Sequence, residues 1–177
     1  METSTEQPFR GGSEGEGTVF RITPAGTLTT IYNFCSLAGC ADGYNSTAGL
    51  IQGADGYLYG APARGGDDTI CAIDGYTGCG TVFKMTLTGS LTVLHTFEFS
   101  DGAYPIGRLA LGSDGNFYGT TECGGASSLC SENCGTVSPL TVSPPPLRCS
   151  VRAPPSGPQS RPAPPAVQSR WLRRVAP

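Results

Sequence analysis

Residues 17–23 of this chain read Gly-Thr-Val-Phe-Arg-Ile-Thr, and residues 80–86 read Gly-Thr-Val-Phe-Lys-Met-Thr. The similarity continues for eleven more positions at a constant offset of 63 residues. A second block, residues 42–66, returns at an offset of 59 in residues 101–125. Because self-similarity at a fixed period is typical of repeat architectures, the chain is predicted to contain a tandem repeat of about 59 residues.

The regular segments of each copy have the pattern of short β-strands. In residues 91–97, apolar and β-branched residues recur with period two, which predicts that His95 shares a strand face with its apolar neighbours. Asp55-Gly56 and Asp114-Gly115 each separate two apolar runs, and this dipeptide predicts a hairpin with a primed turn. Each repeat is therefore predicted to form four antiparallel strands.

A four-stranded sheet of this size cannot bury both of its faces alone, so it must stack on a copy of itself. Radial stacking of such sheets gives a β-propeller, which typically has about 4–8 blades. The predicted fold class is all-β, with four-stranded antiparallel repeats stacked as a partial β-propeller over residues 11–137. This range holds one full blade between two partial ones, because the repeat is entered midway at Gly11 and left midway at Val137. Residues 1–10 are predicted to be disordered.

The complete motif resembles a known family. Gly-Thr-Val-Phe-basic-x-Thr, then Asp-Gly, then Leu-x-x-Gly-x-Asp-Gly-x-x-Tyr-Gly resembles the GloVer tandem repeat of secreted or surface-anchored bacterial proteins. The pattern is also similar to blades of the wider NHL-like propeller class. The resemblance covers residues 11–137. It implies a β-propeller-like fold and an extracellular location, and it implies no settled enzyme activity and no defined active-site residues.

Charge is divided unevenly along the chain. Residues 1–137 carry a formal charge of −9, and residues 138–177 carry +6. An acidic body argues against nucleic acid as a partner, because phosphate binding needs clustered Lys and Arg. No window approaches the ~18 consecutive apolar residues of a membrane span. Residues 1–10 also lack the apolar stretch of a secretory signal.

The chain has eight cysteines, a density that predicts disulfides and an oxidising compartment. Six of them form pairs that are close in sequence and lie in predicted loops: Cys35 with Cys40, Cys71 with Cys79, and Cys130 with Cys134. Zinc is the alternative, but it needs four ligands, usually from Cys-x2-Cys pairs, and the spacings here differ from pair to pair. We therefore expect local disulfides, no metal and no cofactor. Cys123 and Cys149 have no predicted partner.

The prediction of an exported protein conflicts with the lack of an export signal, and a missing N-terminal segment would reconcile the two. The parent protein is therefore expected to be extracellular or at the cell surface.

The third copy of the repeat stops in mid-motif. Residues 134–137 read Cys-Gly-Thr-Val, but Ser138 stands where Phe is expected, and residues 138–177 contain 11 Pro, six Arg and no acidic residue. One hypothesis is out-of-frame translation of a GC-rich gene. The other is a genuine Pro-rich linker in the polyproline II conformation. Both predict a disordered Pro/Arg-rich tail, because such a segment cannot bury enough apolar area to offset its ordering entropy.

Few residues are candidates for chemistry. His95 is the only histidine, and we interpret it as a polar-tipped core residue rather than a catalytic base. Asp55 and Asp114 are interpreted as turn residues. Asp42 and Asp101 lie in the longer loops between repeats; a turn role is expected, and they are weak candidates for binding sugar hydroxyls or Ca²⁺, although no calcium-loop spacing surrounds them.

The predicted function is a non-enzymatic extracellular repeat module for binding or surface display, with carbohydrate or another surface protein as the ligand. Its other partners would be the remaining repeats of a longer protein. The alternative is a fragment of a propeller-fold carbohydrate-active enzyme, a lyase or glycosidase, which would need a pair of carboxylates for catalysis. Unpaired edge strands of so few repeats also predict self-association of the isolated chain.

Overall fold

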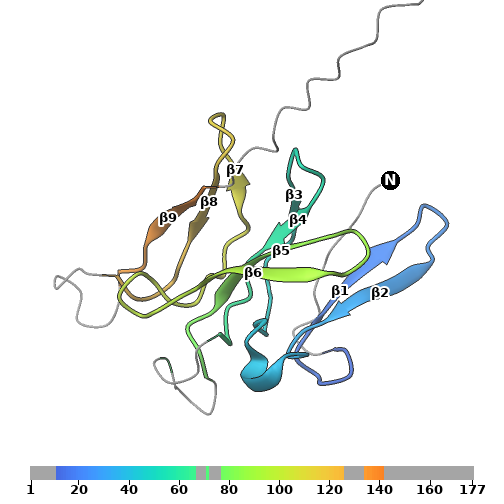
Figure 1. Ribbon diagram of the computed structural model, residues 1–177, viewed down its shortest axis with the longest axis horizontal. Coiled ribbons are helices and arrows are strands. Elements are labelled where there is room, and N and C mark those ends of the chain that lie inside the picture. Colours follow the sequence, from blue (N-terminus) through green and yellow to red (C-terminus); the bar gives the residue numbers. More distant parts are fainter. Residues whose placement is uncertain (1–10, 67–70, 72–76, 126–133, 142–177) are drawn as a thin grey trace, which may run out of the picture. The chain divides into compact units, whose positions relative to one another are not determined.

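The computed structural model describes residues 11–66, 71, 77–125 and 134–141. These residues form three antiparallel sheets that follow one another along the chain (Figure 1). The strands are β1 (Thr18–Ile22), β2 (Leu28–Asn33), β3 (Ile51–Gln52), β4 (Leu58–Gly60), β5 (Thr81–Met85), β6 (Leu91–Thr96), β7 (Ala110–Leu111), β8 (Phe117–Thr120) and β9 (Val137–Leu140). One 3-10 turn, η1 (Ala38–Cys40), follows β2.

The first sheet is β1-β2, the second is β3-β4-β5-β6 and the third is β7-β8-β9. The predicted all-β class and antiparallel pairing are confirmed, as is one four-stranded sheet between two smaller ones. The repeat also fixes the register. Leu58 pairs with Met85 in the second sheet, and the equivalent Phe117 pairs with Leu140 in the third.

The hairpins at Asp55-Gly56 and Asp114-Gly115 are present, but their turn type differs from the prediction. Gly56 donates its N–H to the carbonyl of Gly53 at 3.0 Å, and Gly53 donates to Tyr57 at 2.9 Å, which encloses three loop residues instead of two. Gly56 has a φ of 83°, whereas Asp55 does not have positive φ. This is a turn closed by a left-handed glycine, a geometry that suits the twist of the strands as well as a primed turn does.

A β-bulge interrupts β2 and β6, the last strands of the first and second sheets, and the sequence pattern does not reveal it. Val82 pairs with His95 and Phe83 pairs with Val93, so Leu94 is an extra residue in β6. The first sheet has the same irregularity at Ile31. Because an extra residue reverses the alternation of faces, His95 does not share a face with Val93, and that part of the prediction is wrong.

Each sheet buries apolar side chains against the next. One cluster joins the first and second sheets and contains Val19, Phe34, Tyr44, Leu50, Leu58, Phe83 and Met85. A second cluster joins the second and third sheets and includes Tyr59, Val82, Phe97, Leu109 and Phe117. The ring of Tyr59 lies 4.4 Å from that of Phe117. The second sheet thus packs both of its faces, which is the condition that the repeat architecture was predicted to meet.

The predicted boundary of the folded region at residue 138 lies inside a strand. Ser138, Pro139 and Leu140 continue from Val137 as β9 and pair with β8. Strand pairing uses the backbone, and Pro139 is tolerated because β9 is the last strand of its sheet among the described residues. The disorder expected for residues 1–10 and for residues beyond 141 concerns positions outside the described part of the chain.

Candidate functional site

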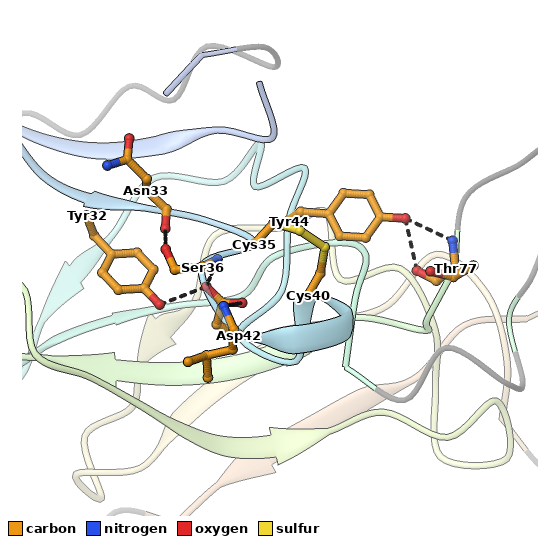
Figure 2. The surroundings of a disulfide bond; sticks show 9 residues. Tyr32, Asn33, Cys35, Ser36, Cys40, Asp42, Tyr44 and Thr77 are labelled. Carbon is orange, nitrogen blue, oxygen red and sulfur yellow. Dashed lines mark hydrogen bonds between the residues drawn. A yellow bond between two sulfur atoms is a disulfide. The ribbon is translucent and has the colours of Figure 1, made fainter. Parts of the chain in front are cut away.

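The first candidate, Asp42, lies just after η1 and is fully buried. Its Oδ2 accepts hydrogen bonds from the hydroxyl of Tyr32 at 2.7 Å and from the backbone N–H of Ser36 at 3.0 Å. Its Oδ1 accepts from the N–H of Leu37 at 3.2 Å. Figure 2 shows how the side chain points into the loop that leaves β2. Asp42 therefore holds the shape of this loop and presents no carboxyl surface to solvent.

Asp101 is the equivalent residue of the next repeat, but its surroundings differ. Its Oδ2 lies 2.9 Å from Nε2 of His95, and its Oδ1 accepts from the N–H of Glu98 at 2.9 Å. The two side chains of this pair are 41% and 44% exposed. Histidine thus replaces the tyrosine that binds Asp42, and the polar pair faces solvent. Asp101 is accessible to a ligand, whereas Asp42 is not.

The position of His95 corrects its interpretation as a core residue. The bulge at Leu94 turns His95 toward the face that carries Val82, and its ring lies edge-on against Phe97 at 4.8 Å with its Nε2 toward Asp101. No single-residue propensity signals the bulge. The equivalent pairs Ile31-Tyr32 and Leu94-His95, where a large side chain follows a large apolar one in both copies, are the signal that could have indicated it.

Asp55 and Asp114 have the turn role that their sequence context predicts. Asp55 accepts from the N–H of Tyr57 at 3.2 Å and from the hydroxyl of Tyr59 at 2.7 Å. Asp114 accepts from the N–H of Asn116 at 3.1 Å and from the hydroxyl of Tyr118 at 2.8 Å. Hydrogen bonds from Asn116 and Tyr118 lower the pKa of Asp114. Each of these carboxyl groups closes its own hairpin.

Burial, followed by the hydrogen bond and negative charge of Asp42, raises the pKa of Tyr32 to about 12. Burial and Asp55 likewise raise the pKa of Tyr59 well above its ordinary value. An unfolded tyrosine loses its proton near pH 10. These two side chains therefore stabilise the fold fully below about pH 10 and lose that contribution as the pH rises toward the folded-state values.

We expect the free energy of unfolding to fall between about pH 10 and pH 12, and Tyr32→Phe to reduce the slope of that fall. Urea titrations at a series of pH values, with phenolate absorbance recorded in parallel, measure both effects. Lysine titration contributes equally to the slopes of Tyr32→Phe and wild type, so the difference between the two slopes does not contain it. Identical slopes for the two proteins would contradict the assignment.

Two of the three predicted cysteine pairs are at disulfide distance. Cys35 and Cys40 are joined in the loop after β2, with Cα atoms 4.0 Å apart. Cys71 and Cys79 are joined between β4 and β5, with Cα atoms 5.1 Å apart. The third pair remains a prediction, because Cys130 lies outside the described residues, as does Cys149. Both observed bridges close loops whose lengths differ between the repeats.

Reduction of these bridges is expected to lower the free energy of unfolding by about 2–3 kcal/mol each, because short closed loops restrict the unfolded chain. Urea unfolding of the double variants C35S/C40S and C71S/C79S measures the two bridges separately. In the denatured, unreduced wild type, at most four of the eight cysteines should react with a thiol reagent. Eight reactive thiols after oxidative refolding would refute the pairing.

A cavity of about 340 Å³ lies between the second and third sheets. Its walls come from β5, β6, β8 and β9 and from the loop before β7, and they are mainly apolar. His95 and Asp101 line it where they are half-exposed, so the accessible carboxyl group and the cavity form one site. The lining residues are Ala61, Val82, Leu94, His95, Phe97, Asp101, Pro105, Gly107, Leu109, Gly119, Thr120, Ser138, Pro139 and Leu140.

The chemistry available at this site is limited. Among the described residues that line the cavity, Asp101 is the only carboxylate and His95 is the only imidazole. Within the same described ranges, no three His, Cys, Asp or Glu side chains cluster closely enough to hold a metal ion. The site is therefore an apolar cavity with one hydrogen-bonded polar pair, His95–Asp101, at its edge. The structure contains no helix of sufficient length and apolarity to span a membrane, as judged on its described residues.

Comparison with known proteins gives one match. The family model described as the Gloeobacter/Verrucomicrobia repeat matches residues 8–144. The match includes all three sheets and extends past the end of β9. No curated protein and no solved structure gives a significant match.

Proposed function

Because this chain belongs to the Gloeobacter/Verrucomicrobia repeat family, we propose that it is a non-enzymatic, β-propeller-like repeat module for extracellular binding or surface display. The repeat architecture carries this proposal. The second sheet packs both of its faces on equivalent neighbours, so further repeats can be added by the same contacts. In a longer protein, the remaining repeats would be the first partners of this chain.

The two disulfides support an extracellular location. The bridges Cys35–Cys40 and Cys71–Cys79 are compatible with an oxidising compartment, where such bonds persist. Both bridges join segments between strands, and Cys71 and Cys79 are buried among the apolar side chains between the second and third sheets. Fractionation of the native host with antibodies against residues 11–137 tests this directly. Recovery of the protein only from the cytoplasm, with its cysteines reduced, would refute the location.

The proposed ligand is a carbohydrate or another surface protein, bound through the loops between sheets. The accessible pair His95–Asp101 supports this choice, because hydroxyl-rich ligands need exposed acceptors and donors of this kind. Asp101 also lacks a partner carboxylate in the described lining, whereas glycosidases use two. This supports binding over hydrolysis.

A glycan array with the full chain tests the proposal. Binding is expected to be lost in Asp101→Ala and retained in Asp114→Ala, a matched control in which the altered carboxyl group only closes a hairpin. Circular dichroism of both variants verifies that the fold is kept. Release of reducing sugar from a bound glycan would overturn the non-enzymatic assignment, and equal binding by both variants would remove Asp101 from the site.

A further inference from the structure

The two interfaces between sheets are built from equivalent strands, and Phe83 marks one of the differences between them. In the first interface, the ring of Phe83 lies over Gly60 and packs edge-on against Phe34 with ring centroids 5.5 Å apart. The approach is close, because a Cβ placed on Gly60 would lie 2.8 Å from the Phe83 ring and 2.4 Å from Leu50. Phe83 is fully buried there.

In the second interface, the same register places Ser138 where Phe83 would be. Ser138 pairs with Gly119 as Phe83 pairs with Gly60. A Cβ on Gly119 would meet only Leu109, at 2.8 Å, and no aromatic ring. Phe97 is the equivalent of Phe34 and lines the 340 Å³ cavity together with Ser138, Gly119 and Leu109. The cavity therefore occupies the place that a phenyl ring fills in the first interface.

We propose that this cavity binds a single aromatic ring, which takes the place of the Phe83 ring and packs edge-on against Phe97. Apolar cavities with such walls bind benzene-sized ligands, since the ring regains contacts that an empty space cannot provide. The half-exposed pair His95–Asp101 lies at the edge of the same cavity. A short cationic arm on the ring would reach Asp101, so the ligand class is a small arylalkylamine.

This inference shares Asp101 with the proposed carbohydrate or protein ligand, but the aromatic ring itself would bind in the interior of the interface and not at the outer loops. A failed glycan array would leave it standing. Conversely, a failed ring-binding experiment would leave the repeat-module proposal standing.

The test uses 4-fluorobenzylamine and 4-fluorotoluene as probes, with binding to the full chain followed by fluorine NMR. A ligand of this size is expected to bind with a dissociation constant on the order of 1 mM. Ser138→Phe should abolish binding of both probes and raise the melting temperature, because its own ring would take the place proposed for the ring of the ligand. Ser138→Ala is the matched control and should bind both probes as wild type does.

Ser138→Leu provides a second variant with a larger side chain if Ser138→Phe does not fold. It should raise the dissociation constants of both probes by about tenfold or more. Asp101→Asn should weaken the binding of 4-fluorobenzylamine and leave the binding of 4-fluorotoluene unchanged. Unaltered probe binding in the filling variants, or no binding to wild type at several millimolar, would overturn the proposal. An equal loss of both probes in Asp101→Asn would overturn the assignment of the amine arm.

Discussion

Phe34→Ala is expected to reduce the free energy of unfolding by about 3–5 kcal/mol, the range measured for buried phenylalanines. Phe34 is fully buried, and its ring packs edge-on against both Tyr32 and Phe83 at centroid distances of 5.5 Å. Removing it opens a cavity in a closely packed interface. A domain with a typical total stability of about 5–15 kcal/mol would lose a large part of it.

Phe97→Ala supplies the matched comparison. Phe97 is the equivalent residue of the second interface and is 5% exposed, but one side of its ring already faces the cavity. We therefore expect a smaller loss, about 2–3 kcal/mol, because fewer packing contacts are removed. Urea unfolding followed by circular dichroism measures both variants. Equal losses would show that the cavity is filled or collapsed in solution.

Asp42→Asn is expected to cost about 3 kcal/mol, because one carboxyl oxygen becomes an NH₂ group among buried donors. Tyr32 and Ser36 both donate to Oδ2, and Leu37 donates to Oδ1. Whichever oxygen is replaced, at least one donor then faces another donor. The fully buried site leaves little room for water to repair the mismatch.

The control for this change is Asp101→Asn, which alters the equivalent carboxyl group in a half-exposed position. Solvent can satisfy the displaced donors there, so the expected cost is below about 1 kcal/mol. The difference between the two variants in urea unfolding is the decisive quantity. If Asp101→Asn lowers the free energy of unfolding as much as Asp42→Asn does, burial does not determine how strongly these carboxyl groups stabilise the fold.

The repeat in the sequence was sufficient to predict the sheets, their order and their pairing. Offsets of 63, 59 and 55 residues align the strands of the second sheet with those of its neighbours, and the observed registers repeat accordingly. The bulge at Leu94 was not predictable from alternation alone, since a single extra residue leaves composition and spacing unchanged. Because the bulge is not visible in the sequence, the sequence predicts the wrong strand face for His95.

The candidate site was predicted in part. Asp101 and Asp42 have the same sequence context, yet only the structure separates them, because exposure depends on the loop that each one closes. The cavity had a visible signal in Ser138, which breaks the motif where Phe83 stands in the preceding copy. By sequence alone this break predicts the end of the fold, whereas β9 continues through Ser138. Two positions later, Leu140 and Thr141 agree with Met85 and Thr86, and the strand continues.

One disulfide-closed loop makes this scaffold suitable for peptide grafting. The loop between Cys35 and Cys40 must keep its conformation, because Ser36 and Leu37 donate to the buried carboxyl group of Asp42. The other bridge holds the Cα atoms of Cys71 and Cys79 5.1 Å apart. Because the bridge fixes both attachment points, an engineered epitope of almost any length between them would leave the strand ends in place. An array of such repeats would present one grafted peptide per repeat at a regular spacing.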